Sequence, residues 1–339
     1  MKHRDTDRPA PPDGLVIVDK PAGWTSHDVV GRLRRLAGTR RVGHAGTLDP
    51  MATGVLVLGV EKATRLLGHL ALTRKVYEAT IRLGQATVTD DAEGEVTEAA
   101  DAAHLRDAQI VAAIGALTGE IMQVPSSVSA IKVNGVRSYA RVRSGDEVKL
   151  AARPVTVYVF DVHEIRRTQA ARMVAQAAEL GAEAEVEAEA AEAVEAAAGA
   201  ADGLGVLDVD VSVECSSGTY IRALARDLGA ALGVGGHLTA LRRTLVGPYG
   251  LEQAHTLDAL AATVQDGGPL PMLPIAEAAA TAFPRYDVDG DQAKAIAHGG
   301  FLPAPGLGAG PIAVFGPDGA FLALVEERGG RAKPIAVFV

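Results

Sequence analysis

The sequence contains one cysteine, Cys215, among its 339 residues. A single thiol excludes a disulfide framework and a cysteine-based zinc site, and free cysteine is usually buried, so we expect Cys215 to be a structural thiol. No apolar run approaches the roughly 20 residues that a membrane-spanning helix needs. The N-terminal stretch MKHRDTDRPAPPDG lacks the apolar core of a signal peptide. These absences predict a globular, cytoplasmic protein that does not enter a membrane.

Familiar catalytic motifs are also missing. The sequence has no GxxxxGK phosphate loop, no GxSxG nucleophile elbow and no HExxH pair. His44 and Asp49 lie five residues apart, but two such residues are too few for a metal site. We therefore expect neither a metal nor a cofactor.

Positive charge is scarce overall, but it is unevenly distributed. The formal net charge is −9, which on its own argues against a polyanionic partner such as RNA. However, residues 170–202 carry a net −7 and include 16 alanines, whereas residues 1–75 carry a net +6. The Ala/Glu-rich segment has almost no apolar stripe, so we interpret it as a solvated insertion, a frayed helix or a disordered segment between two strands. The basic N-terminal region is then the part of the chain suited to RNA.

The hydrophobic pattern mixes strands and helices without a regular βαβ rhythm, which indicates an α+β fold. Helices are expected over 26–36, where Thr25 and Asp28 have capping-box spacing, and over 220–232. Strands are expected over 15–18, 55–60, 75–84, 153–165 and 206–215. From about residue 283, short strands alternate with Gly/Pro turns. We therefore expect a flexible tail over 1–13, a main domain over 14–270 and a small β-rich domain over 283–339.

Two segments carry residues suited to catalysis. In the loop GHAGTLDPMATG (43–54), glycines permit unusual backbone angles that can bring the Asp49 carboxylate beside a ligand. Spacing alone, however, favours an ordinary Asx-turn before Pro50. In SGTYIRALARDLG, Arg222 and Arg226 lie one helical turn apart beside the apolar stripe. Either arginine could reach inward to a carboxylate or remain on the surface.

Five blocks of the sequence resemble the TruB family of tRNA pseudouridine synthases. They occur in the family's order over 14–30, 41–67, 75–94, 124–145 and 215–249, and include DKP, GHAGTLDP, KVYEA, GTYIR and TALRR. The resemblance implies the pseudouridine synthase fold, with a central mixed, mostly antiparallel sheet, and a PUA-like RNA-binding domain over 283–339. It also implies isomerisation of uridine to pseudouridine at position 55 in the T arm of tRNA. The expected enzyme is a monomer without a cofactor, metal or obligatory protein partner.

The resemblance also assigns roles to individual residues. Asp49 matches the catalytic aspartate, Arg222 the arginine that pairs with it, and Tyr77 the tyrosine that stacks on the flipped base. The other matches bind or support the substrate: His44, which helps to flip the base, Tyr220 and Leu241 in the active site, Lys20 and Pro21 under the catalytic loop, and Arg65, where lysine is common. Ser217 departs from the pattern, because a basic residue often precedes GTYIR.

The residues themselves fit this chemistry. A carboxylate can attack covalently and divide one difficult step into two easier ones. A neighbouring arginine keeps that carboxylate ionised despite burial, and Tyr77 could take the final proton. The target base must leave its stack, and basic residues would hold the RNA phosphates. Candidates for the phosphate contacts are Arg32, Arg34, Arg35, Arg40 and Arg41.

Two rival functions remain open from the sequence alone. One is a non-catalytic protein that binds RNA or helps tRNA to fold, and the other is a guide-RNA-dependent synthase of the dyskerin type. The intact set of Asp49, Tyr77, Tyr220 and Arg222 favours catalysis over the first. The second would need basic extensions and partner proteins, and the acidic C-terminal part argues against it.

Overall fold

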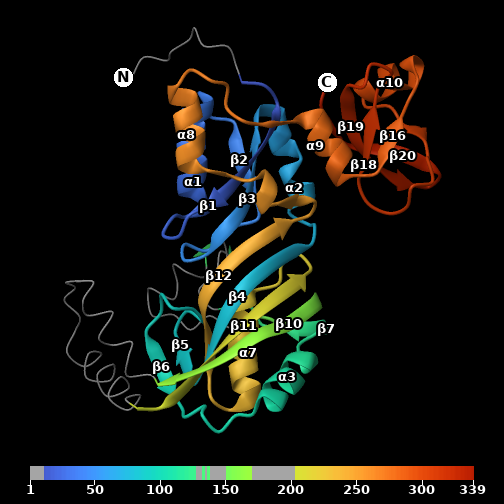
Figure 1. Cartoon of the computed structure of the whole chain (residues 1–339). Helices are drawn as coiled ribbons and strands as arrows, with labels where there is room; N and C mark the ends of the chain where they lie inside the picture. Colours follow the sequence, from blue (N-terminus) through green and yellow to red (C-terminus); the bar gives the residue numbers. More distant parts are fainter. Residues whose placement is uncertain (1–10, 127–131, 134–135, 138–149, 170–202) are drawn as a thin grey trace. The chain divides into compact units, whose positions relative to one another are not determined.

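The computed structural model describes residues 11–126, 132–133, 136–137, 150–169 and 203–339 (Figure 1). The chain divides into two compact units. Unit 1 combines the two ends of the chain, up to Thr73 and from Thr244 onward, and unit 2 is the intervening Arg74–Arg243. The predicted insertion over 170–202 lies outside the described residues. Within those residues, no helix is long and apolar enough to cross a membrane.

The first part of unit 1 is a small sheet around β1 (Gly14–Lys20) and β3 (Thr53–Val60), which pair antiparallel. Three shorter strands extend it: β2 (Val42–Ala45) beside β3, and β14 (His255–Thr256, parallel) and β15 (Leu273–Pro274, antiparallel) beside β1. Side chains alternate between the faces of a strand. Leu15 and Ile17 therefore enter one core, and Val16 and Val18 another. Burial on both faces explains why β1 and β3 are continuous apolar runs.

Helix α1 (Ser26–Ala37) begins where the capping-box spacing predicted. The Thr25 hydroxyl accepts a hydrogen bond from the Asp28 N–H at 3.1 Å, and the Asp28 carboxylate accepts one from the Thr25 N–H at 3.0 Å. The helix ends at Gly38, whose φ of 69° is the left-handed conformation that favours glycine. Its apolar stripe packs with Leu260 of α8 (Leu257–Gln265). The arginines of α1 therefore stay on the outer side of the helix.

The C-terminal part of unit 1 is a five-stranded sheet, as the pattern of short strands predicted. The order is β16 (Arg285–Asp287), β18 (Ile312–Phe315), β19 (Phe321–Arg328), β20 (Arg331–Val337) and β17 (Leu302–Pro303), with α10 (Gly290–Ala297) beside β19 and β20. Phe315, Phe321 and Phe338 enter the same core as Leu15 of β1. Helix α9 (Ile275–Ala282) adds two alanines to that core. The two ends of the chain therefore share one hydrophobic interior.

Unit 2 is built on an antiparallel sheet. The order is β12 (Gly236–Val246), β4 (Lys75–Leu83), β11 (Gly205–Cys215), β10 (Arg153–Gln169) and β7 (Gly119–Gln123). Helix α7 (Ile221–Leu232) packs against β4, and α3 (Asp107–Ala116) packs against α7 and β10. Two small hairpins join β5 (Gln85–Thr87) to β6 (Val96–Ala99) and β8 (Lys132–Val133) to β9 (Val136–Arg137). The expectation of an α+β fold with mixed, mostly antiparallel pairing is confirmed.

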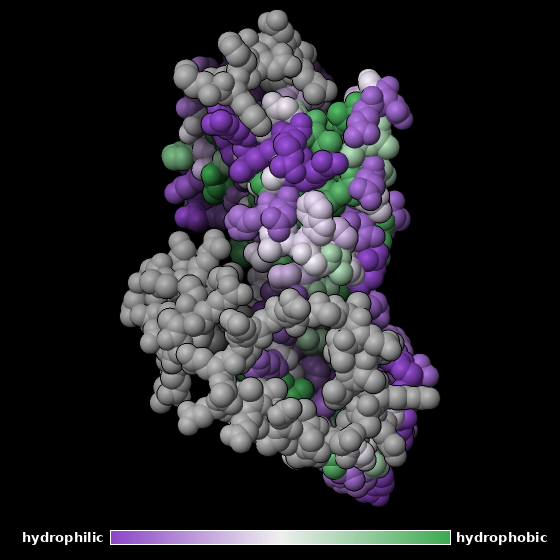
Figure 2. Space-filling model, turned by 90° about the vertical axis from the view of Figure 1, so that its left-hand side faces the viewer, coloured by the Kyte–Doolittle hydropathy of each residue, from purple (hydrophilic) through white to green (hydrophobic). Residues whose placement is uncertain are grey.

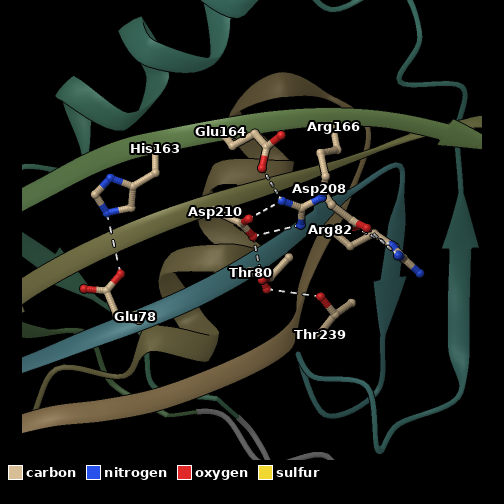
Figure 3. Close-up of polar contacts among 9 residues, drawn as sticks. All are labelled: Glu78, Thr80, Arg82, His163, Glu164, Arg166, Asp208, Asp210 and Thr239. Carbon is tan, nitrogen blue, oxygen red and sulfur yellow. Dashed lines mark hydrogen bonds and ion pairs between the residues drawn. The ribbon is translucent and has the colours of Figure 1, made fainter.

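The face of the unit 2 sheet that Figure 3 shows is polar, and its charges pair across strands. The Arg82 guanidinium donates two hydrogen bonds to the Asp208 carboxylate, at 2.8 and 2.7 Å. Arg166 binds Asp210, which also accepts a hydrogen bond from the Thr80 hydroxyl at 2.7 Å. In this cluster, carboxylates outnumber arginines. The face is therefore poorly suited to the phosphates of RNA.

Candidate active site

The loop that carries Asp49 connects β2 to β3 in unit 1. Its backbone turns tightly, because the Ala52 N–H donates to the Asp49 carbonyl at 3.1 Å. Gly46 near its start has a φ of 80°, a conformation that side chains rarely adopt. His44 was predicted to lie within this loop, but it is on β2, opposite Leu58 of β3. The strand pairing continues further than the glycine pattern suggested.

Lys20 supports this loop from a fully buried position. Its Nζ donates to the carbonyls of Pro21 at 2.9 Å, Trp24 at 2.7 Å and Pro50 at 3.1 Å. The Gly23 N–H donates to the same Pro50 carbonyl at 2.9 Å. The end of β1 and the residue after Asp49 are therefore held together by a buried cation.

Ser26 fixes the residue before Asp49. This side chain is 1% exposed, and its hydroxyl accepts a hydrogen bond from the Leu48 N–H at 2.9 Å and donates one to the Leu48 carbonyl at 3.1 Å. Both backbone groups of one loop residue are thus satisfied by one hydroxyl. No local pattern predicts this contact, because Ser26 looks like an ordinary first residue of a helix.

The predicted phosphate-binding arginines lie on or after α1. Arg34, Arg35, Arg40 and Arg41 are exposed and Arg32 is half-buried. Arg41 forms an ion pair with Glu61 at 3.4 Å, and Arg34 donates to the Val42 carbonyl at 3.1 Å. The face of the molecule in Figure 2 carries hydrophilic and hydrophobic residues side by side. Four of the five arginines are therefore accessible to solvent, and their contact with RNA phosphates stays a prediction.

Two other predicted residues of unit 1 have specific partners. The imidazole rings of His44 and His27 meet edge to face, with their centroids 5.7 Å apart. The Arg65 guanidinium donates to the Val337 carbonyl of β20 at 2.6 Å. Arg65 therefore contacts the C-terminal sheet.

In unit 2, Tyr220 directly precedes α7 and is held by Gln123. The fully buried Gln123 amide donates to the Tyr220 carbonyl at 3.0 Å and accepts from the Tyr220 N–H at 2.8 Å. The Arg153 guanidinium lies 4.9 Å from the centroid of the Tyr220 ring. Neither Gln123 nor Arg153 was predicted, because they lie on two other strands, β7 and β10, that are far from Tyr220 in the chain.

Arg222 lies in the first turn of α7 and forms a buried ion pair with Asp91. The Arg222 Nη1 lies 3.3 Å from the Asp91 Oδ2, and the two side chains are 5% and 3% exposed. The same Nη1 donates to the Thr89 carbonyl at 2.8 Å. The Asp91 Oδ1 accepts from the Thr89 hydroxyl at 2.5 Å and from the Glu93 N–H at 3.1 Å. Arg222 is thus tightly positioned by one turn of unit 2.

One helical turn later, Arg226 contacts Asp90 at 3.3 Å. The prediction that either arginine of α7 could reach a carboxylate is confirmed for both. Asp90 and Asp91 were missed as functional candidates, although they stand in the block TVTDDAEG.

The remaining predicted residues of unit 2 lie in its sheet. Tyr77 of β4 is opposite Val213 of β11 and is 9% exposed, and Leu241 of β12 is 8% exposed. Cys215 is buried, as predicted, and burial raises the pKa of its thiol to about 11. The predicted site residues are therefore divided, with Lys20, Pro21, His44, Asp49 and Arg65 in unit 1 and Tyr77, Tyr220, Arg222 and Leu241 in unit 2.

His163 and Glu78 also meet on the polar face of unit 2 (Figure 3), and Ser212 contacts the same histidine. The His163 Nε2 lies 2.5 Å from the Ser212 Oγ and 3.5 Å from the Glu78 Oε2. Both contacts use the same ring nitrogen, whereas a catalytic triad uses one nitrogen for each partner. We assign no catalysis to this group. Over the described part of the chain, no three His, Cys, Asp or Glu side chains are grouped to hold a metal ion.

Comparison with known proteins gives the family. Residues 34–180 match the TruB family pseudouridylate synthase (N terminal domain). A Streptomyces griseus subsp. griseus protein named tRNA pseudouridine synthase B is 60% identical over 333 residues, which cover 98% of this chain and 99% of that protein. The chain belongs to the TruB family. The resemblance inferred from the five sequence blocks is confirmed.

Further matches extend the TruB-family similarity along the chain. Residues 222–269 match the tRNA pseudouridylate synthase B C-terminal domain, and residues 283–339 match tRNA Pseudouridine synthase II, C terminal. A relative from Arthrobacter sp. (strain FB24), also named tRNA pseudouridine synthase B, is 57% identical over 334 residues, covering 96% of each chain.

Solved structures confirm the pseudouridine synthase fold of this TruB-family chain. A chain in a structure described as "Crystal Structure of a Cbf5-Nop10-Gar1 Complex" matches with a TM-score of 0.66 and 25% identity, covering 99% of this chain and 91% of that one. A chain in "Structure of H/ACA RNP bound to a substrate RNA containing 2'-deoxyuridine" matches with a TM-score of 0.63 and 25% identity, covering 96% and 85%.

Proposed function

We propose that this TruB-family protein is a tRNA pseudouridine synthase that isomerises uridine 55 in the T arm of tRNA. The observation that carries the proposal is the 60% identity, over 98% of this chain, to a protein named tRNA pseudouridine synthase B. Two features of the structure support it. A carboxylate stands on a loop held by buried side chains in unit 1, and a buried arginine stands at the start of α7 in unit 2.

In the proposed reaction, the N1–C1′ bond of the uridine breaks and a C5–C1′ bond forms. The C5 proton is lost and N1 gains a proton, so no oxidant or reductant is consumed. Asp49 is the nucleophile, and Tyr77 stacks on the base and takes the C5 proton. Arg222 pairs with Asp49 and keeps it ionised.

The substrate is a folded RNA loop whose target base must be flipped out of its stack. In this proposal, His44 helps to open the T loop, and Tyr220 and Leu241 line the pocket for the base. Lys20, Pro21 and Arg65 support the loop and its surroundings. The basic residues on and after α1 hold the phosphates: Arg32, Arg34, Arg35, Arg40 and Arg41.

The main domain over 14–270 would carry the catalysis, and residues 283–339 would act as a PUA-like RNA-binding domain. The protein would work in the cytoplasm as a monomer without an obligatory protein partner, and the insertion over 170–202 would be dispensable. Relatives named tRNA pseudouridine synthase B are 53–60% identical to this chain, whereas the chain from the Cbf5-Nop10-Gar1 complex is 25% identical. This difference favours a stand-alone enzyme over the guide-RNA-dependent alternative.

The test is tritium release from a tRNA transcript that contains 5-tritiated uridine, with the purified full-length protein alone. We expect release of one tritium per tRNA by the wild type, and none from a transcript in which cytidine replaces uridine 55. The Asp49→Ala variant should be inactive. Asp258→Ala, on an exposed turn of α8, is the matched control and should keep the wild-type rate.

Each result bears on a different part of the proposal. A wild type that releases no tritium would refute the enzyme, and release from the cytidine transcript would refute the position. Wild-type turnover by Asp49→Ala would refute the nucleophile. Arg222→Met should lose most activity, because the proposed nucleophile loses its cationic partner, when it is assayed at a temperature where the variant is folded. Breaking the buried pair with Asp91 should also lower the free energy of unfolding by about 3–5 kcal/mol. Unchanged turnover in that variant would remove Arg222 from the site.

A further inference from the structure

Two ion pairs lie side by side between α7 and one turn of unit 2. Asp90 and Asp91 are consecutive in the turn, and their partners Arg226 and Arg222 are four residues apart on the helix. Residues four apart on a helix lie on the same face. The inner pair, Arg222–Asp91, is almost fully buried, whereas in the outer pair Asp90 is 12% and Arg226 is 29% exposed. The proposed function uses the inner pair and gives the outer pair no task.

The turn that carries the two aspartates has an unusual backbone. Asp90 has a φ of 60°, in the left-handed region, which Asp and Asn tolerate better than other side chains. Its backbone is held on both sides, because its N–H donates to the Thr87 carbonyl at 3.3 Å and its carbonyl accepts from the Leu238 N–H at 3.1 Å. A rotation at Asp90 would move the Asp91 carboxylate away from Arg222.

Arg226 connects this turn to a second element. Its Nη2 donates to the Val124 carbonyl at 2.7 Å, just after β7, and its Nη1 meets Asp90 at 3.3 Å. The Asp227 carboxylate accepts hydrogen bonds from the Arg226 Nε at 2.9 Å and from the Nη2 at 2.8 Å. Since Gln123 precedes Val124 and clamps Tyr220, the end of β7 contacts α7 at two places. Arg226 therefore fixes the turn, the helix and the end of β7 relative to one another.

Burial of the Asp90 carboxylate carries a cost for folding that its partners offset only in part. Burial raises the pKa of Asp90 above its ordinary value, although the Ser126 hydroxyl, Arg226 and Arg222 act in the opposite direction. When folding raises the pKa of a carboxyl group, the protonated group favours the folded state at low pH. This contribution to stability is lost as the pH rises and the group ionises. At neutral pH the ionised Asp90 is therefore a net cost to folding. Charged groups that are buried at such a cost are concentrated at functional sites.

We propose that Asp90 and Arg226 are positioning residues that fix the Asp91 carboxylate and, through it, the Arg222 guanidinium. The inference rests on the proposed function, because the purpose of a fixed Arg222 is to hold the catalytic carboxylate. The outer pair would not touch the substrate. It would set the orientation of the inner pair, so its loss should slow the chemical step and leave tRNA binding unchanged.

The test compares Asp90→Asn with Asp227→Asn. Asparagine keeps the shape of Asp90 and tolerates its positive φ, so the variant removes only the charge. Asp227→Asn removes the charge of a second, half-buried carboxylate on the same guanidinium and is the matched control. We expect the single-turnover rate of tritium release to fall about tenfold in Asp90→Asn, which corresponds to about 1.4 kcal/mol. The dissociation constant for tRNA should change by less than about twofold, and the melting temperature should not fall.

Arg226→Gln gives a second, independent test from the other side of the pair. Its single-turnover rate should fall like that of Asp90→Asn. The double variant should be no slower than the slower single variant, because residues that act as one unit are not additive.

The proposal is wrong if Asp90→Asn and Arg226→Gln react as fast as the wild type. It is also wrong if Asp227→Asn loses as much activity as they do, or if their losses follow a fall in melting temperature. Failure of the proposed function looks different, because the wild type itself would then release no tritium.

Discussion

Replacing Ser26 by alanine tests whether the position of Asp49 depends on a single buried hydroxyl. Ser26 is 1% exposed and satisfies both backbone groups of Leu48, the residue before Asp49. Alanine keeps the helix start but removes both hydrogen bonds. The Leu48 N–H and carbonyl would then be buried without this partner, or the loop would shift to find water.

The loss of stability can be estimated from these contacts. A buried backbone group left unsatisfied costs about 1–3 kcal/mol, so two such groups predict a loss of about 2–4 kcal/mol after some relaxation. A protein with a typical stability of about 5–15 kcal/mol stays folded after that loss. If the loop shifts by about 1 Å, the rate of the chemical step should fall by up to about a hundredfold.

Thr25→Ala is the matched control for Ser26→Ala. Thr25 is the neighbouring N-cap of α1, and its hydroxyl accepts from the Asp28 N–H, so alanine there should cost about 1 kcal/mol without touching the Asp49 loop. Guanidinium unfolding would give both stabilities, and single-turnover tritium release would give both rates at a temperature where all proteins are folded. Equal rates for Ser26→Ala and Thr25→Ala would refute the idea that Ser26 positions Asp49.

Two further predictions concern unit 2. Gln123→Leu should lower the free energy of unfolding by about 1–3 kcal/mol, because the Tyr220 N–H and carbonyl lose their partner. Urea unfolding would measure this, and Gln265→Leu, at the exposed end of α8, should change stability by less than about 0.5 kcal/mol. Equal losses in the two variants would contradict the clamp. Cys215 should not react with a thiol reagent at pH 8 in the native protein, since its pKa is about 11 and it is 1% exposed. One thiol should react after unfolding, and rapid labelling of the native protein would show that the strand end is open.

Helices and strands with a clear capping or hydrophobic pattern in their own sequence were predicted correctly. The capping box at Thr25 and Asp28, the apolar strands β3, β4 and β11, and the stripe of α7 all appeared close to their expected bounds. Helix α9 was missed because its sequence IAEAAATA buries only two alanines, so it has no apolar stripe to detect. The pattern of α10 is similarly weak, with one buried residue, Ile296.

The candidate site was predicted in part. The arginines of α7 were recognised as able to reach inward, but their partners were not, because Asp91 and Arg222 are far apart in the chain. The contacts of Ser26 with Leu48 and of Gln123 with Tyr220 were missed for the same reason. A single sequence carries no signal for a side chain that satisfies a backbone group in another element. The family was recognised because its motifs are local.

The shared core of unit 1 has a consequence for the order of folding. Leu15 of β1 and Phe338 at the far end of the chain belong to the same cluster, while unit 2 lies between them in the sequence. During synthesis, residues 74–243 are complete before the second half of unit 1 exists. The core that the first 73 residues share with the C-terminal part therefore cannot form until that part has been synthesised. Contacts between such distant segments slow folding, and loss of the last few residues should expose hydrophobic surface around β1 in the newly made chain.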